Sequence, residues 1–103
     1  GNAVRFGEFV LEPDAYLLRK AGAKVPLSNR EFEVLAYLAA HPDRALSPDT
    51  IYAGVWRQEF GDVTAVAVYV QRLRRKIEAD PSNPRFLQTV TGKGYRFSPG
   101  GGA

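Results

Sequence analysis

The residues from about 62 to 79 constrain the fold most, because they read as one helix with two unlike sides. Four apolar residues recur at steps of four, three and four: Val66, Val70, Leu73 and Ile77. This spacing places them on one continuous helical stripe. The opposite side carries polar and basic residues and one valine: Thr64, Val68, Gln71, Arg72 and Arg75. Such a helix buries one side in a core and presents the other.

Four cations lie within five positions of this helix: Arg72, Arg74, Arg75 and Lys76. A solvated helix face usually mixes in Glu at four-residue spacing, which gains roughly 0.2–0.5 kcal/mol per pair; here only Glu78 is available. Residues 63–103 hold seven bases and two acids, a net charge of +5, which leaves −2 for residues 1–62 out of the total of +3. This asymmetry predicts a polyanionic partner, with a merely solvated face as the alternative.

Length and composition predict one domain with its own core. The chain has 103 residues, of which 45% are apolar and 12% aromatic, enough for a single core. It has no Cys, which excludes disulfides and cysteine-based metal sites and suits a cytoplasmic location. No apolar run approaches the roughly 18 residues of a membrane span, and no signal peptide opens the chain. We therefore expect no membrane contact. The absence of Met favours an excised part of a longer protein.

Short segments rich in aromatic and β-branched residues precede the helices and predict an antiparallel sheet of three or four strands. They read VRFGEFVLE, AYLLRK and AGAKVPL. A first helix is expected to begin at Ser28, because Ser28 and Glu31 form a capping box, and to stop at His41-Pro42. A second is expected from Ser47-Pro48 to Val55-Trp56.

The segment RFLQTVTGKGYRF predicts a hairpin, with strands over residues 86–90 and 95–97. Gly92 and Gly94 keep its turn thin, with Lys93 at the tip. The glycine-rich tail predicts disorder. The domain is expected over residues 4–98, with disordered ends at 1–3 and 99–103.

Two helices, a third cationic helix and a basic hairpin are the order of a winged helix-turn-helix. The predicted fold class is therefore α+β, with an N-terminal antiparallel sheet, three helices and a C-terminal β-hairpin wing. A helix of about 10–12 Å diameter fits the major groove of DNA. There Arg72 suits bidentate contact with a guanine or its phosphates, and Val68 suits contact with a thymine methyl group. Arg72 and Arg74 fall on different sides of the helix and need not share a role. Trp56 is expected either to anchor the core or to donate a hydrogen bond from its indole N–H to a phosphate.

These features predict sequence-specific binding of double-stranded DNA for transcription regulation. The alternative is a winged-helix interaction module whose basic face binds an acidic protein partner. The TGKGY segment does not match a phosphate-binding loop, because a strand follows Lys93 where that motif requires Ser or Thr and a helix. With one His, no Cys and no evident carboxylate pair, no enzyme activity, cofactor or metal is expected.

The sequence resembles the effector domains of OmpR/PhoB-type response regulators over residues 4–98. The resemblance is carried by LSNREFEVLAYLAAHPDRALS, VWRQEF and VYVQRLRRKIEADPSNPRFLQTVTGKGYRF, in this order. It implies a four-stranded N-terminal sheet, a third helix in the major groove and a wing at the minor groove. It also implies binding to direct repeats and control by a receiver domain that precedes the effector domain, or by another regulatory domain in its place. A loop that contacts RNA polymerase is implied at Arg57, Gln58, Glu59, Phe60, Gly61 and Asp62.

The resemblance also assigns roles to single residues. Arg72 matches a base-reading arginine, and Val68 an apolar base contact. Contacts to the DNA backbone or groove are expected from Trp56, Thr64, Tyr69, Gln71, Arg74, Arg75, Thr89, Thr91, Lys93 and Tyr95. Thr64, Gln71 and Thr91 stand where many members carry Arg, so the usual half-site is not expected here.

Overall fold

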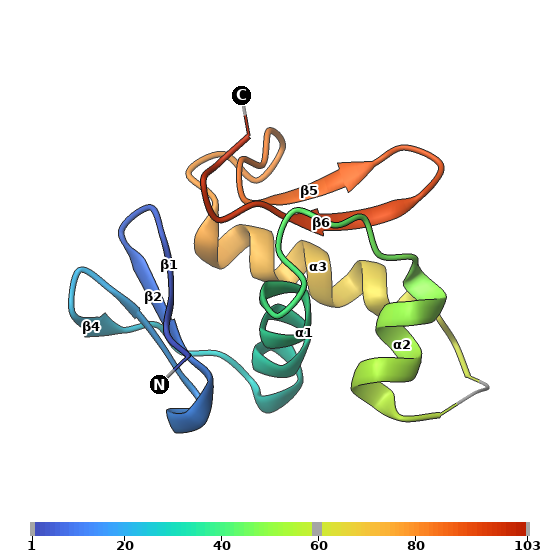
Figure 1. Cartoon of the computed structure of the whole chain (residues 1–103), viewed down its shortest axis with the longest axis horizontal. Helices are drawn as coiled ribbons and strands as arrows, with labels where there is room; N and C mark the ends of the chain where they lie inside the picture. Colours follow the sequence, from blue (N-terminus) through green and yellow to red (C-terminus); the bar gives the residue numbers. More distant parts are fainter. Residues whose placement is uncertain (1, 59–60, 103) are drawn as a thin grey trace.

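The computed structural model describes residues 2–58 and 61–102, and it contains a sheet, three helices and a hairpin in chain order (Figure 1). The antiparallel N-terminal sheet has the strand order β1 (Val4–Phe6), β2 (Phe9–Glu12), β3 (Leu17–Lys20) and β4 (Ala23–Lys24). The helices are α1 (Asn29–Ala39), α2 (Pro48–Trp56) and α3 (Thr64–Ile77), and the hairpin pairs β5 (Leu87–Val90) with β6 (Gly94–Phe97). The predicted fold class, an α+β winged helix-turn-helix, is confirmed.

The core joins the sheet, the helices and the base of the hairpin. Phe6 of β1 packs against the rings of Phe9, Phe86 and Phe97 with centroid distances of 5.0, 5.2 and 5.0 Å. The two ends of the chain therefore share one aromatic cluster. The predicted stripe of α3 is buried, with exposed fractions from 0% to 2% for Val66, Val70, Leu73 and Ile77.

The first two helices begin where local sequence signals place them. Ser28 Oγ accepts from the backbone N–H of Glu31 at 3.1 Å, and the Glu31 carboxylate accepts from the Ser28 N–H at 2.8 Å. This is the predicted capping box. Ser47 caps α2 by accepting from the N–H of Thr50 at 3.1 Å. These two starts are confirmed.

Helix α3 is shorter than predicted, ending at Ile77 rather than near Ala79. Glu78 has an extended backbone (φ −99°, ψ 138°), and its buried carboxylate accepts hydrogen bonds from the backbone of residues 85–87. Turning the Glu78 side chain toward that segment ends the helix. Strand β5 begins at Leu87 rather than at the predicted Phe86, and β6 begins at Gly94 rather than at Tyr95.

A backbone bridge joins the hairpin to the segment before α2. Leu46 N–H donates to Tyr95 O at 2.8 Å, and Tyr95 N–H donates to Leu46 O at 3.0 Å. Gly94 makes this approach possible, because a Cβ there would overlap the carbonyl oxygen of Leu46 and its φ is +139°. Strand β6 is therefore held to the start of α2.

The C-terminal tail lies against the hairpin. The N–H of Gly102 donates to Arg85 O at 2.8 Å, and that of Gly101 donates to Ser98 O at 3.0 Å. The composition of the tail predicts disorder, because composition does not reveal hydrogen bonds such as these. The domain limits of 4–98 stay a prediction. Among the helices that the structure describes, none has both the length and the apolar character needed to cross a bilayer.

Candidate nucleic-acid interface

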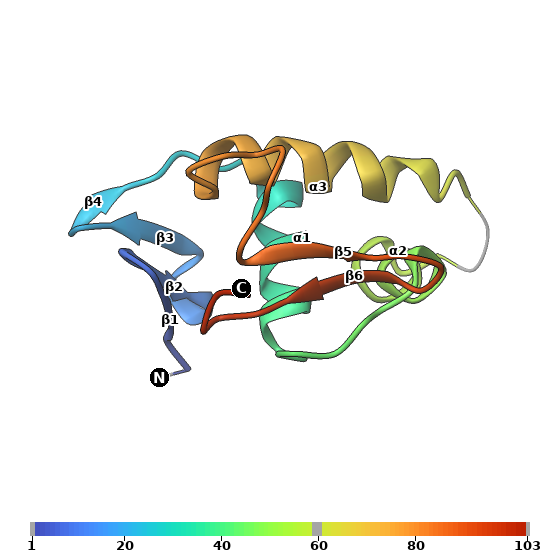
Figure 2. The same ribbon diagram turned by 90° about the horizontal axis from the view of Figure 1, so that it is seen from above.

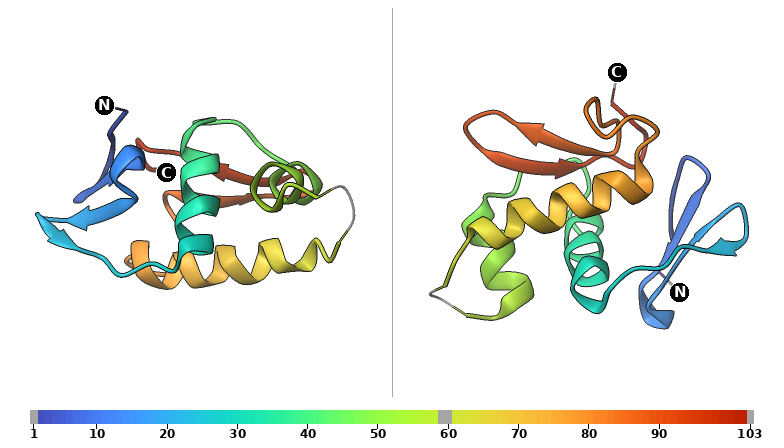
Figure 3. Two further views of the ribbon diagram at one scale, coloured as in Figure 1. Left: turned by 90° about the horizontal axis from the view of Figure 1, so that it is seen from below. Right: turned by 180° about the vertical axis from the view of Figure 1, so that it is seen from behind.

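One side of α3 is free of the protein core. Its exposed residues include the five expected from the helical angle: Thr64, Val68, Gln71, Arg72 and Arg75. Ala67 and Lys76, on the flanks of the helix, are exposed as well. Val68 is 47% exposed, which leaves a large apolar side chain among polar neighbours without any gain from burial. Seen from behind and from above, α3 and the hairpin lie side by side, with the N-terminal sheet beyond the C-terminal end of α3 (Figures 2 and 3). The exposed side of α3 is thus left open beside the hairpin.

Arg72 lies over an aromatic group. Its guanidinium is 5.1 Å from the ring centroid of Tyr69, which meets Trp56 edge to face at 5.6 Å. Trp56 in turn stacks on Tyr52 at 5.0 Å and lies under the guanidinium of Arg30 at 4.8 Å. Trp56 is half-buried and packs against the core. Its predicted contact with a phosphate stays a prediction. This aromatic support restricts the orientation of Arg72 before any partner arrives.

The density of cations at residues 72–76 predicts one outward cluster, and the structure corrects this prediction. Arg72 and Arg75 are exposed, whereas Arg74 is only 9% exposed. Arg74 Nε donates to Leu87 O at 2.9 Å, and its Nη2 donates to Thr89 Oγ1 at 2.7 Å. Burial lowers the pKa of Arg74, opposed by the nearby Tyr95 and Glu78. The group still stays cationic at neutral pH, because an arginine pKa starts so high.

Lys76 bonds to α1 and to the segment that precedes it. Its Nζ donates to Glu31 Oε1 at 2.7 Å and to Pro26 O at 2.9 Å. Burial raises the pKa of Glu31, but hydrogen bonds from Lys76 and Ser28 outweigh it and hold that pKa below its ordinary value. This pair ties the end of α3 to the start of α1, so Lys76 serves the fold.

The hairpin presents its turn to solvent. Thr89, Thr91 and Lys93 are exposed, and the turn closes with a hydrogen bond from Lys93 N–H to Val90 O at 2.9 Å. Tyr95 is half-buried, with its ring centroid 5.8 Å from the guanidinium of Arg74. The predicted wing residues therefore lie on the hairpin beside α3, with Lys93 near its tip.

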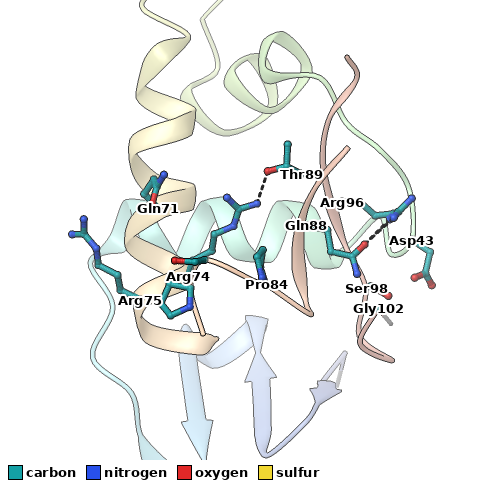
Figure 4. A pocket seen from close by; sticks show the side chains of 12 residues that line it. Asp43, Gln71, Arg74, Arg75, Pro84, Gln88, Thr89, Arg96, Ser98 and Gly102 are labelled. Atoms are coloured by element: carbon teal, nitrogen blue, oxygen red, sulfur yellow. Dashed lines mark hydrogen bonds between the residues drawn. The ribbon is translucent and has the colours of Figure 1, made fainter. Parts of the chain in front are cut away.

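A groove of about 1030 Å³ lies between α3 and the hairpin. Gln71, Arg74 and Arg75 of α3 and Thr89 of β5 are among its lining residues, and Figure 4 shows the Arg74 guanidinium directed toward Thr89. Sequence reasoning missed part of its lining: Asp43, Pro81, Ser82, Pro84, Gln88, Arg96, Ser98 and Gly102. Strand alternation marks Gln88 and Arg96 as one cross-strand pair, and Arg96 donates to Gln88 Oε1 at 3.0 and 2.8 Å. Three arginines and one aspartate line this groove, and this excess of positive charge suits anions.

The loop between α2 and α3 is exposed at four of its predicted contact residues: Arg57, Gln58, Gly61 and Asp62. Glu59 and Phe60 lie outside the described residues. Asp62 accepts from the N–H of Thr64 at 3.0 Å and from its hydroxyl, and these bonds lower the pKa of Asp62. Thr64, expected at the DNA backbone, is therefore also part of the start of α3.

The sheet, the three helices and the hairpin define a winged helix-turn-helix domain with a polar, cationic groove beside its third helix. A family described as "Transcriptional regulatory protein, C terminal" matches residues 22–97, and the chain belongs to this family. The predicted resemblance to OmpR/PhoB-type effector domains is confirmed. This is a family of transcription regulators and not of enzymes.

Solved structures agree with this assignment. The DNA-binding domain of RstA from Klebsiella pneumoniae, in complex with the RstA box, is 29% identical with a TM-score of 0.85, over 96% of this chain and 99% of that one. The effector domain of BfmR from Acinetobacter baumannii is 29% identical with a TM-score of 0.77, over 95% and 91%. The response regulator DrrB from Thermotoga maritima is 26% identical with a TM-score of 0.84, over 93% of this chain. This chain spans only 44% of the length of DrrB.

Proposed function

We propose that this domain binds double-stranded DNA in a sequence-specific manner and thereby regulates transcription. Helix α3 lies in the major groove and the hairpin reaches the adjacent minor groove. The RstA domain, which this chain resembles over nearly its whole length, forms a complex with a DNA box. The chain is the output domain of a longer, two-component type of regulator.

The observation that carries the proposal is the exposed side of α3 together with the groove beside it. Arg72 and Val68 lie outward on a helix whose other side is buried. A bidentate arginine contact to guanine and an apolar contact to a thymine methyl group are the interactions these side chains suit. The adjoining groove, with its three arginines, matches the phosphate backbone that borders a major groove.

Arg74 supports a phosphate contact despite its burial. In the described part of the chain, no carboxylate lies within ion-pair distance of its guanidinium. A buried cation is stabilised by an opposite charge, and Arg74 borders the groove, where a phosphate supplies that charge. The remaining backbone or groove contacts are assigned to Trp56, Thr64, Tyr69, Gln71, Arg75, Thr89, Thr91, Lys93 and Tyr95.

Further parts of the proposal concern the partners of the whole regulator. The longer chain of DrrB supports a receiver domain that precedes this one and controls its pairing on direct-repeat sites. The exposed residues Arg57, Gln58, Gly61 and Asp62, together with Glu59 and Phe60, are proposed to contact RNA polymerase. Such a regulator acts in the cytoplasm, where the chromosome lies.

Selection from a random pool of duplexes, followed by salt titration of the enriched site, tests the proposal. We expect one enriched sequence family, and a fall of log affinity with log salt concentration of slope about −4 to −5 for five phosphate contacts. Enrichment of no sequence family, with a slope near zero, would contradict DNA binding and favour an acidic protein partner for the basic face.

A further inference from the structure

We infer that Glu78, acting with Arg74, is a positioning residue that fixes the hairpin relative to α3, so that helix and wing meet DNA as one rigid unit. The hydrogen bonds of these two side chains to residues 85–89 are named here the wing clamp. This inference rests on the proposed DNA binding and assigns Glu78 a part in it.

Glu78 holds the segment that leads into β5. Its Oε1 accepts from the N–H of Arg85 at 2.7 Å, and its Oε2 accepts from the N–H groups of Phe86 at 3.1 Å and Leu87 at 2.8 Å. The residue is only 8% exposed. A carboxylate that gathers three successive backbone donors forms charge-assisted bonds, which are stronger than bonds between neutral groups. The start of β5 is thereby held at the C-terminal end of α3.

Arg74 holds the next part of the same strand, one helical turn earlier. It donates to the carbonyl oxygen of Leu87. It also donates to the hydroxyl of Thr89, as Figure 4 shows. Leu87 therefore gives its N–H to Glu78 and its carbonyl to Arg74. Arg74 and Glu78 therefore hold the start of β5 at two adjacent backbone groups of one residue.

Strand β6 has a different anchor. Its Tyr95 bridges to Leu46, and Phe97 O accepts from the N–H of Asp43 at 2.8 Å. The hairpin is thus attached to the segment before α2 through β6, and to α3 through the clamp on β5. The angle between the hairpin and α3 depends on the second attachment.

Rigid attachment matters because helix and wing contact DNA at two separate places. When two contacts share a rigid frame, the second forms at high effective concentration once the first is made. A loosened hairpin must be ordered during binding, and this ordering offsets what Lys93 contributes. Without the clamp, the contribution of Lys93 to affinity should largely disappear.

A double-mutant cycle with Glu78→Gln and Lys93→Ala tests this inference by DNA affinity at fixed salt. Lys93→Ala alone should weaken binding about 3- to 10-fold, as expected for one lost charged contact. In the Glu78→Gln background the same change should weaken binding less than about 2-fold. Glu78→Gln alone should weaken binding, although it removes a negative charge and would strengthen binding to DNA by charge alone.

Glu12→Gln is the matched control, since it removes the same charge from the N-terminal sheet, where Glu12 pairs with Arg19 at 2.9 Å. In that background Lys93→Ala should keep its full effect. An equal effect of Lys93→Ala in the wild type and in Glu78→Gln overturns the inference. No effect of Lys93→Ala in the wild type overturns the proposed wing contact and, with it, the clamp's role. Absence of duplex binding by the wild type overturns the proposed function itself.

Thr89→Val provides a second route in case Glu78→Gln does not fold. It removes only the exposed hydroxyl that accepts from Arg74 Nη2. We expect it to reduce the effect of Lys93→Ala, though by less than Glu78→Gln. An undiminished effect of Lys93→Ala in this background would count against the clamp.

Discussion

Arg72 lies on the exposed side of α3 with its guanidinium over the ring of Tyr69. We predict that Arg72→Ala costs roughly 1–3 kcal/mol of binding free energy on the selected site and relaxes preference at one base pair. Arg75→Ala, on the same exposed side, should weaken all sequences alike. Affinities of both variants across a library of single base changes provide the measurement. An unchanged base preference in Arg72→Ala would remove Arg72 from base reading.

Tyr69 carries two separable groups, a ring that supports Arg72 and a hydroxyl. The ring packs edge to face with Trp56 and lies 5.1 Å from the Arg72 guanidinium. We predict that Tyr69→Phe keeps the base preference of Arg72 because the ring remains, whereas Tyr69→Leu reduces it because the guanidinium loses its support. Base preference measured on the same library distinguishes them. Equal base preference in the two variants would show that the ring does not position Arg72.

At the scale of elements, the Lys76–Glu31 pair joins α3 to α1. The pKa of Glu31 is lowered on folding, so its contribution to stability is present above its ordinary value of 4.5 and is lost as pH falls through the lower folded value. Glu31→Gln keeps a capping side chain and removes only the charge. We predict a loss of about 1 kcal/mol near neutral pH. The free-energy difference between the two proteins should shrink below about pH 4.5.

The measurement is urea unfolding of both proteins from pH 7 to pH 3. A difference that stays constant over this range would show that the charge of Glu31 does not stabilise the fold.

The bridge between β6 and the segment before α2 depends on Gly94. A Cβ there would overlap the carbonyl of Leu46, whereas a Cβ at Gly92 meets open space. Both glycines have positive φ, +139° and +76°. We predict that Gly92→Ala costs only its backbone strain, about 1–2 kcal/mol. Gly94→Ala should cost clearly more, because the bridge must also move. Thermal unfolding of the two variants compares them, and equal losses would contradict the role of the close approach.

Local signals predicted the elements well, because each signal and its effect lie within a few residues. The capping serines at 28 and 47 and the apolar stripe of α3 belong to this class. The end of α3 was misjudged, because Glu78 turns toward backbone donors seven to nine residues further on. The bridge from Leu46 to Tyr95 spans a still longer stretch of chain, and neither contact has a periodic signature.

The candidate site could be predicted only in part, because contacts between residues far apart in the sequence leave no local pattern. Helical angle separates Arg72 from Arg74, and the structure places the first outward and the second against β5. The helical angle does not show which element a flank of the helix contacts. The bonds of the buried Arg74 to β5 and of the exposed Lys76 to α1 could therefore not be predicted. The direct contacts to DNA assigned to single residues stay proposals.

At the scale of the whole molecule, the exposed side of α3 and the hairpin lie together, and the N-terminal sheet lies beyond the end of α3 (Figure 3). The core supports both at once, because the buried stripe of α3 and the base of the hairpin belong to one cluster. The arrangement predicts that one continuous surface meets DNA and that the sheet does not take part.

Mapping of backbone amide NMR shifts during titration with the selected duplex tests this surface most directly. We expect the shift changes to concentrate on the exposed positions of residues 64–75 and on the turn at residues 91–94, while the amide signals of strands β1 to β4 stay where they are in the free protein. Changes concentrated on the sheet, with α3 and the turn unaffected, would contradict it.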